Sequence, residues 1–302
     1  MKRKPKIGLV LGSGSARGWA HIGVVQALVT AGIKPDVVSG CSIGAFVGAA
    51  YANGDIDKLE RWVSILTRQD VVSLLDVSWR SGFIKGNKLI QFFEEHFVNR
   101  DFSELQIPFA CVATDLESGR EIWLREGNVA RAVRASIALP GLFTPVPHNG
   151  GFLVDGALVN PVPVSLCRAN EADIVIAVDL TSDVIGRTLQ KPGENGQSPT
   201  PASWAKKNRS QFGLRPEKNS AGGVQDTWLP PLLATLSTSI NIMQVRITRS
   251  RLAGEPADVL IVPRLGQLGL MDYHRGEEAI AEGREAVQRM LPLIKAALGQ
   301  AA

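Results

Sequence analysis

The sequence predicts an α/β fold of layered type, in which helices alternate with short buried strands. Three observations support this prediction. Short apolar runs recur without polar alternation, as expected of strands that are buried on both faces. Segments with apolar residues at helical spacing separate these runs. Glycine-rich turns directly follow the first two runs, as at strand–helix connections in parallel sheets.

The first strand is expected at Ile7–Leu11, and the glycine-rich loop 12–18 follows it. A helix comes next, with apolar residues between Ile22 and Val29 and a C-terminal cap at Gly32. A second strand is expected at 35–39. Strand, helix and strand over this length predict a parallel pair with a right-handed crossover. The turns that follow the two strands should therefore lie side by side at one sheet edge.

The later elements are predicted from the same two patterns. They are, in chain order, helices within 56–100, a strand at 108–114 paired with a strand at 121–125, a helix at 129–137, strands at 152–154 and 174–178, a helix at 232–252, a strand at 258–263 and a helix at 275–298. Together they divide the chain into a main domain at 7–180, a flexible linker or long loop at 184–226, and a C-terminal helical extension at 227–302 that packs on the domain.

Composition restricts the classes of function. The chain has 302 residues, of which 45% are hydrophobic and 21% charged, as in ordinary globular domains. No apolar stretch is long enough to span a bilayer. The net charge of +4 permits an anionic partner, such as a membrane surface, but lacks the dense basic patch of a nucleic-acid binder. Peripheral contact with the inner face of the membrane and formation of a homo-oligomer stay open.

The N-terminus and the cysteines predict a cytoplasmic protein. Residues 1–6 are basic, but the apolar run 7–11 is too short for a signal peptide. Cys41, Cys111 and Cys167 form no Cys-x-x-Cys pair, which indicates free thiols in a reducing compartment. The histidines lack metal-ligand spacing, so neither a metal nor another cofactor is expected.

The sequence Gly40-Cys41-Ser42-Ile43-Gly44 has the pattern of a nucleophile elbow between a strand and a helix. Glycines two places either side of Ser42 remove side chains that would collide across the sharp turn. The serine hydroxyl would then be accessible, close to the positive end of a helix. A glycine-rich turn without chemistry fits this motif alone equally well.

The loop Gly12-Ser13-Gly14-Ser15-Ala16-Arg17-Gly18 is a poor nucleotide site. A dinucleotide fingerprint needs a glycine where Arg17 stands and an acidic residue at the end of the second strand, whereas Asp36 begins it. A phosphate loop needs Gly-Lys-Ser/Thr, which is missing. An oxyanion hole fits better, because the N–H groups of Gly14 and Ser15 can point at one oxygen. Arg17 is expected to brace the loop, and contact with a phosphate is the alternative role.

Asp155 is the best candidate for a base. His21, His148 and His274 lack the context of a catalytic histidine and are interpreted as structural. Asp155 ends a strand, so it should reach the same sheet edge as Ser42, and Gly156 allows a tight turn after it. A serine–aspartate dyad follows, provided that burial raises the basicity of the carboxylate.

Four motifs in this order resemble the patatin-like phospholipase family, and its short bacterial RssA-type members in particular. They are the loop Gly12–Gly18, the elbow Gly40–Gly44, the segment Ala135-Ser136-Ile137-Ala138-Leu139-Pro140 and the segment Asp155-Gly156-Ala157. The resemblance is strongest over residues 7–180. It implies a three-layer α/β/α domain with a mostly parallel central sheet that cleaves acyl esters of lipids.

By this resemblance, Ser42 is the nucleophile, Asp155 the general base and the loop Gly12–Gly18 the oxyanion hole. Ser13 and Ser15 stand where many members of the family have glycine. Within the same class, a transacylase or thioesterase stays open. A regulatory or scaffold protein that binds a partner is the alternative, motivated by the long linker and the basic C-terminal helix.

Overall fold

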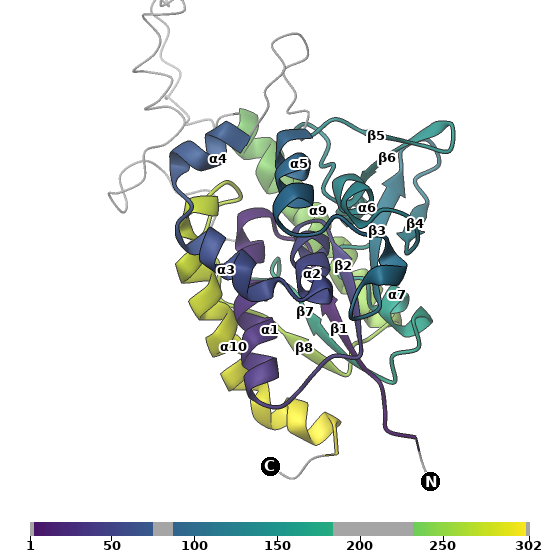
Figure 1. Ribbon diagram of the computed structural model, residues 1–302, viewed down its shortest axis with the longest axis vertical. Helices are drawn as coiled ribbons and strands as arrows, with labels where there is room; N and C mark the ends of the chain where they lie inside the picture. The colour runs from purple at the N-terminus through teal and green to yellow at the C-terminus, as the bar shows by residue number, and fades with distance from the viewer. Residues whose placement is uncertain (1–2, 75–86, 184–231, 300–302) are drawn as a thin grey trace, which may run out of the picture.

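The computed structural model of the chain describes residues 3–74, 87–183 and 232–299. Within them, one mixed sheet of eight strands lies between two layers of helices (Figure 1). The three-layer α/β/α fold class is thereby confirmed. The predicted linker at 184–226 lies outside the described residues. No described helix combines the length and apolar content needed to cross a bilayer.

The central strands of the sheet are parallel. The strand order is β5-β6-β3-β2-β1-β7-β8, and β4 also pairs with β3. Strands β1, β2, β3, β7 and β8 run parallel to one another, whereas β4 and β6 pair antiparallel with β3, and β5 pairs antiparallel with β6. The strand bounds are β1 Ile7–Leu11, β2 Val37–Cys41, β3 Phe109–Asp115, β4 Glu121–Leu124, β5 Val146–His148, β6 Gly151–Asp155, β7 Ile174–Val178 and β8 Val259–Ile261.

Helices join and cover these strands. The α-helices are α1 Ala20–Thr30, α2 Ile43–Asn53, α3 Ile56–Ser64, α4 Arg68–Leu74, α5 Asn87–His96, α6 Val129–Ser136, α7 Val164–Ala169, α9 Leu232–Gly254 and α10 Gly276–Ala297. Short 3-10 turns are η1 Ser15–Trp19, η2 Phe102–Glu104, η3 Gly156–Leu158 and η4 Tyr273–Arg275.

Most predicted elements form within a few residues of their expected bounds. The second strand is an exception, because it runs from Val37 to Cys41 rather than over 35–39. Its ladder with β1 begins at Val37 opposite Gly8. Before that point, the side chain of Asp36 binds the start of β1, because it accepts a hydrogen bond from the N–H of Ile7 at 2.8 Å. The strand therefore ends directly before Ser42.

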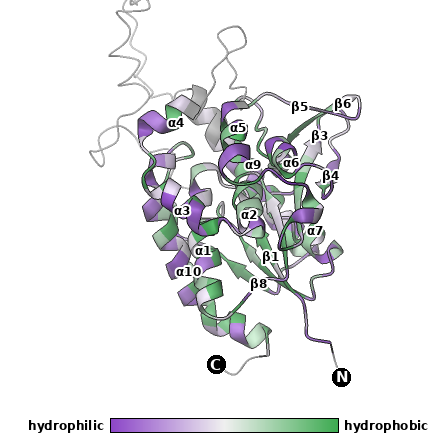
Figure 2. Cartoon of the chain, in the orientation of Figure 1, coloured by the Kyte–Doolittle hydropathy of each residue, from purple (hydrophilic) through white to green (hydrophobic). Residues whose placement is uncertain are grey.

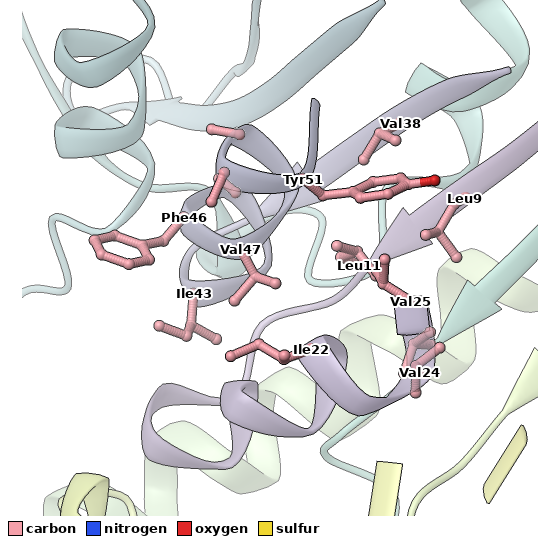
Figure 3. Packing of buried hydrophobic residues seen from close by; sticks show 14 of the residues in the cluster. Leu9, Leu11, Ile22, Val24, Val25, Val38, Ile43, Phe46, Val47 and Tyr51 are labelled. Atoms are coloured by element: carbon pink, nitrogen blue, oxygen red, sulfur yellow. The ribbon is translucent and has the colours of Figure 1, made fainter. Parts of the chain in front are cut away.

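The two faces of the sheet pack against different helices. Leu9 and Leu11 of β1 join the large core formed with α1, α2 and α10, part of which Figure 3 shows. Val10 points to the opposite face and packs with Val164 and Cys167 of α7. This alternation follows from the period of two in a strand. In Figure 2, strands β1 and β8 are mainly hydrophobic, whereas hydrophilic residues lie along α3 and α10.

The C-terminal elements complete both the sheet and one helical layer. Strand β8 pairs in parallel with β7. Helix α10 packs on α1 at backbone distance, because a Cβ on Gly23 would lie 1.9 Å from the carbonyl oxygen of Ile280. Reciprocally, a Cβ on Gly283 would lie 2.0 Å from the carbonyl oxygen of Ala20. Neither position has room for a side chain, so the two helices can approach this closely only where these two glycines face the other helix.

Candidate active site

The structure places Ser42 in a sharp turn between β2 and α2. Its backbone has φ 56° and ψ −124°, a conformation that residues other than glycine rarely adopt. The flanking glycines are required by space. A Cβ on Gly40 would lie 2.6 Å from the Cα of Ala45, and one on Gly44 would lie 2.0 Å from the carbonyl oxygen of Leu11. This turn presents the Ser42 hydroxyl to a pocket.

Ser42 and Asp155 are in direct contact. The Oγ of Ser42 donates a hydrogen bond of 2.6 Å to Oδ2 of Asp155. The other carboxylate oxygen, Oδ1, accepts from the N–H of Ala157 at 2.8 Å. Asp155 is only 1% exposed. Burial raises the pKa of Asp155 to about 7, although the hydrogen bonds from Ser42 and Ala157 oppose this shift.

Asp155 lies next to Ser42 because of a strand arrangement that differs from the expected one. Strand β6 is antiparallel to β3, so its C-terminal end does not belong to the edge where the parallel strands end. Strand β2 pairs with β3 up to Val112, and β6 pairs with it from Ala113 onward. Strand β4 overlaps both ranges and therefore takes the other edge of β3. Strands β2 and β6 thus meet head-on, which brings Ser42 and Asp155 together.

Ser136 fills the junction between these two strand ends. Its hydroxyl accepts a hydrogen bond from the backbone N–H of Ser42 at 2.9 Å and donates one to the carbonyl oxygen of Val112 at 2.7 Å. Ser136 is fully buried at the end of α6. In the gap between the C-terminal ends of β2 and β6, the hydroxyl takes the place of a hydrogen bond between strands. It therefore supports the turn at Ser42.

The glycine-rich loop lies beside Ser42, as the parallel pairing of β1 and β2 predicts. The N–H groups of Gly12 and Ser13 are used within the fold, by the carbonyl oxygens of Val178 and Pro161. The N–H groups of Gly14 and Ser15 have no hydrogen-bond partner among the described residues. Ser13, Gly14 and Ser15 line the pocket together with Ser42. Two backbone donors are therefore available next to the Ser42 hydroxyl.

Arg17 lies beneath this loop, outside the pocket lining. It is 1% exposed, and its Nη2 donates a hydrogen bond of 3.1 Å to Oδ1 of Asn241 on α9. Burial lowers the pKa of Arg17 to about 10, and the nearby carboxylate of Asp179 opposes that shift. The guanidinium thus links the loop to α9, which fits a structural brace and leaves it no access to a ligand in the pocket.

No described histidine hydrogen-bonds Ser42 or Asp155. His21 is buried, and one ring nitrogen lies 2.8 Å from the carbonyl oxygen of Gly12. Burial lowers the pKa of His21 to about 4, so the ring is neutral at pH 7. His274 accepts from Arg68 at 3.1 Å, and His148 is exposed at the end of β5. The described residues also contain no group of three or more His, Cys, Asp or Glu suited to a metal ion.

The pocket around Ser42 is largely apolar and holds about 940 Å³ of space, its open mouth included. The apolar residues in its lining are Trp19, Ile43, Phe46, Trp62, Leu66, Val71, Leu89, Ile137, Leu139, Leu142, Phe143, Ile240, Leu270 and Met271. Trp62 and Leu66 lie within 56–100, where the sequence predicts helices, but apolar spacing along a helix does not distinguish residues of a pocket wall from residues of the core. Tyr273 also lines the pocket and carries no motif.

Comparison with known proteins identifies relatives of this chain. The sequence model described as patatin-like phospholipase matches residues 9–168. An uncharacterized NTE family protein of Mycobacterium tuberculosis is 31% identical over 335 residues, which cover 95% of this chain and 91% of the relative. A solved structure with a related chain path, that of VipD from Legionella pneumophila, has a TM-score of 0.43 and 12% identity, and the match covers 96% of this chain and 67% of that one.

Two named relatives are much longer than this chain. Lysophospholipase NTE1 of Coccidioides immitis is 28% identical over 299 residues, and the match covers 96% of this chain but 18% of that protein. Human patatin-like phospholipase domain-containing protein 6 is 34% identical over 184 residues, or 58% of this chain and 13% of that one. Since the family model matches residues 9–168 of 302 and the mycobacterial relative matches nearly end to end, the chain belongs to the patatin-like phospholipase family of lipid acyl hydrolases.

Proposed function

We propose that the chain hydrolyses lipid carboxylic esters with Ser42 as nucleophile and Asp155 as general base. The observation that carries this proposal is the hydrogen bond of 2.6 Å from the Ser42 hydroxyl to a buried carboxylate. A base whose pKa is about 7 is ionised in a large fraction of molecules at neutral pH and still accepts a proton effectively. The dyad therefore needs no histidine.

In the first step, Ser42 Oγ attacks the ester carbonyl carbon while its proton moves to Oδ2 of Asp155. The carbonyl oxygen becomes an oxyanion, which the N–H groups of Gly14 and Ser15 stabilise. The tetrahedral intermediate collapses, the bond to the alcohol oxygen breaks, and Asp155 returns the proton to the leaving alcohol. The product of this step is an acyl-enzyme on Ser42.

In the second step, water attacks the acyl-enzyme. Asp155 takes a proton from the water, and the same two N–H groups stabilise the second oxyanion. Collapse releases the fatty acid, and the proton returns to Ser42 Oγ. One ester and one water thus give one acid and one alcohol, with Ser42 and Asp155 regenerated.

The pocket supports a lipid acyl chain as the group transferred. Its lining near Ser42 includes the aromatic side chains of Trp19, Phe46 and Trp62, which stabilise a buried hydrocarbon chain through removal of apolar surface from water. The name of the fungal relative, lysophospholipase, supports a phospholipid with a single acyl chain as the substrate class.

The test compares the parent chain with Ser42→Ala on a lysophospholipid and a soluble short-chain ester, together with labelling by a fluorophosphonate. We expect Ser42→Ala to lose both hydrolysis and labelling, by at least about a thousandfold, with an unchanged circular dichroism spectrum. Peptide mapping should place the label on Ser42. Hydrolysis by Ser42→Ala at the parental rate would refute the mechanism. A folded parent that neither hydrolyses nor reacts would instead favour a binding role for the fold.

A further inference from the structure

Ser15 in the glycine-rich loop adopts an unusual conformation for a residue with a side chain. Its φ is 53°, in the left-handed region that glycine occupies readily. The Oγ of Ser15 donates a hydrogen bond of 2.6 Å to the carbonyl oxygen of Leu270. The same Oγ lies 2.8 Å from the hydroxyl oxygen of Tyr273. Two contacts thus join the loop to a segment more than 250 residues later in the sequence.

The direction of the second hydrogen bond follows from the first. A serine hydroxyl has one hydrogen, and in Ser15 the carbonyl oxygen of Leu270 receives it. Tyr273 must therefore donate its own hydrogen to Ser15 Oγ. The resulting chain runs from the Tyr273 hydroxyl through Ser15 to Leu270. The backbone N–H of Ala16 donates to the same carbonyl at 3.2 Å, which ties the loop a second time.

Tyr273 is itself held firmly. Its ring packs edge-on against Trp19, with centroids 5.9 Å apart, and its carbonyl oxygen accepts from Nε1 of Trp19 at 3.1 Å. Arg275 braces the same segment by donating to the carbonyl oxygen of Gln267 at 2.9 Å. Because these contacts hold Tyr273 in one position, its hydroxyl can hold the Ser15 side chain in one position as well.

We infer that Tyr273 is a positioning residue of the active site, which acts by holding Ser15 in its left-handed conformation. In that conformation Gly14 and Ser15 line the pocket beside Ser42, and their N–H groups have no hydrogen-bond partner among the described residues. Tyr273 lies outside residues 9–168, the part that the family model matches. This inference rests on the proposed function, because it assigns Tyr273 a role in stabilising the oxyanion that Ser42 generates.

A double-mutant cycle tests this role. The parent, Tyr273→Phe, Ser15→Gly and the double variant are compared for kcat and KM on a soluble short-chain ester, and for the rate of fluorophosphonate labelling. Glycine at 15 adopts φ 53° without help and gives Tyr273 no hydroxyl to bind. Tyr51→Phe is the matched control, because Tyr51 and Tyr273 are the two tyrosines of the chain. Ser15→Ala removes the other end of the hydrogen bond.

We expect Tyr273→Phe to lower kcat about tenfold with KM within about twofold, since negative charge develops on the carbonyl oxygen toward the transition state and is absent from the bound ester. In the Ser15→Gly background, the same change should have less than about a twofold effect. Ser15→Ala should lower kcat as Tyr273→Phe does, and Tyr51→Phe should not.

Equal slowing by Tyr273→Phe in both backgrounds, or none in either, would overturn the inference while leaving Ser42 as the labelled nucleophile. A label that forms on another residue, or persists in Ser42→Ala, would instead refute the proposed function and this inference with it.

Discussion

Ser42 and Ser15 are the same residue type at the same kind of turn, yet their hydroxyls have opposite surroundings. Both follow strands that pair in parallel, and both hold a positive φ, 56° and 53°. The Ser42 hydroxyl has one hydrogen-bond partner among the described residues, the carboxylate of Asp155. The Ser15 hydroxyl donates to a carbonyl oxygen and lies beside a tyrosine hydroxyl.

If Ser42 is the nucleophile, as proposed, this difference implies that backbone strain alone does not make one. A left-handed conformation of a residue other than glycine costs on the order of 1 to 3 kcal/mol, and both serines carry this cost. At Ser42 the turn exposes a hydroxyl to a base and a pocket. At Ser15 the hydroxyl is engaged, and the useful groups are backbone N–H donors. The partner of the hydroxyl therefore distinguishes the two roles.

Among the tests of this contrast, Asp155→Asn is expected to have the largest effect on activity. The change keeps the shape of the side chain but removes the base, so we expect kcat/KM on a soluble ester to fall about a thousandfold. Asp179→Asn is the matched control, because Asp179 is equally buried but does not line the pocket. A fall of similar size in the control would show that burial of charge, rather than base catalysis, explains the result.

The pH dependence of stability should also separate Asp155 from other acids. Its pKa is about 7 in the folded protein and 3.8 as the ordinary value, so the folded state binds the proton more tightly. The resulting stabilisation is complete below pH 3.8 and is lost as pH rises to about 7. From pH 5 to pH 8, the parent should lose on the order of 2 kcal/mol of unfolding free energy relative to Asp155→Asn.

Urea denaturation of both proteins at several pH values measures this difference. Parallel curves for the parent and Asp155→Asn would contradict a raised pKa at Asp155. The same carboxylate predicts that kcat/KM of the parent rises with pH up to about 7, because only the ionised form accepts the proton from Ser42.

A smaller effect is expected from Ser136→Ala, which leaves the hydroxyl of Ser42 untouched. It removes the acceptor for the backbone N–H of Ser42 and the donor to Val112. We expect about tenfold slower fluorophosphonate labelling and a loss of about 1 to 3 kcal/mol of unfolding free energy. Ser118→Ala, in an exposed turn, is the control. Labelling at the parental rate would show that the turn at Ser42 holds its geometry without Ser136.

Local patterns predicted much of this architecture. The strand, glycine turn and helix of Ile7–Thr30 form where periodicity and glycine spacing place them, and the same three elements recur at Val37–Asn53, with the strand shifted by two residues from its predicted bounds. Those patterns are local, because strand and helix periods are set by neighbouring residues. The proximity of Ser42 to the loop Gly12–Gly18 follows from the parallel pairing of β1 and β2, which a strand–helix–strand unit of this length predicts without the rest of the chain.

Features that depend on distant pairing could not be predicted in this way. Asp155 was expected at the sheet edge because it ends a strand, but the reason was wrong, since β6 is antiparallel and meets β2 head-on. The orientation of a strand is decided by its partner, not by its own residues. Tyr273 shows the same limit, because a single tyrosine carries no spacing that points to Ser15.

The close packing of α1 against α10 at Gly23 and Gly283 has a consequence for synthesis of the chain. These glycines allow α1 and α10 to touch, but 260 residues separate them. At about 5 to 20 residues per second, the ribosome reaches Gly283 roughly 13 to 52 s after Gly23. During that interval α1 lacks its covering helix and Ser15 lacks Tyr273. On the proposed mechanism, the nascent chain carries Ser42 long before Tyr273, so full hydrolytic activity is expected only after translation has passed α10.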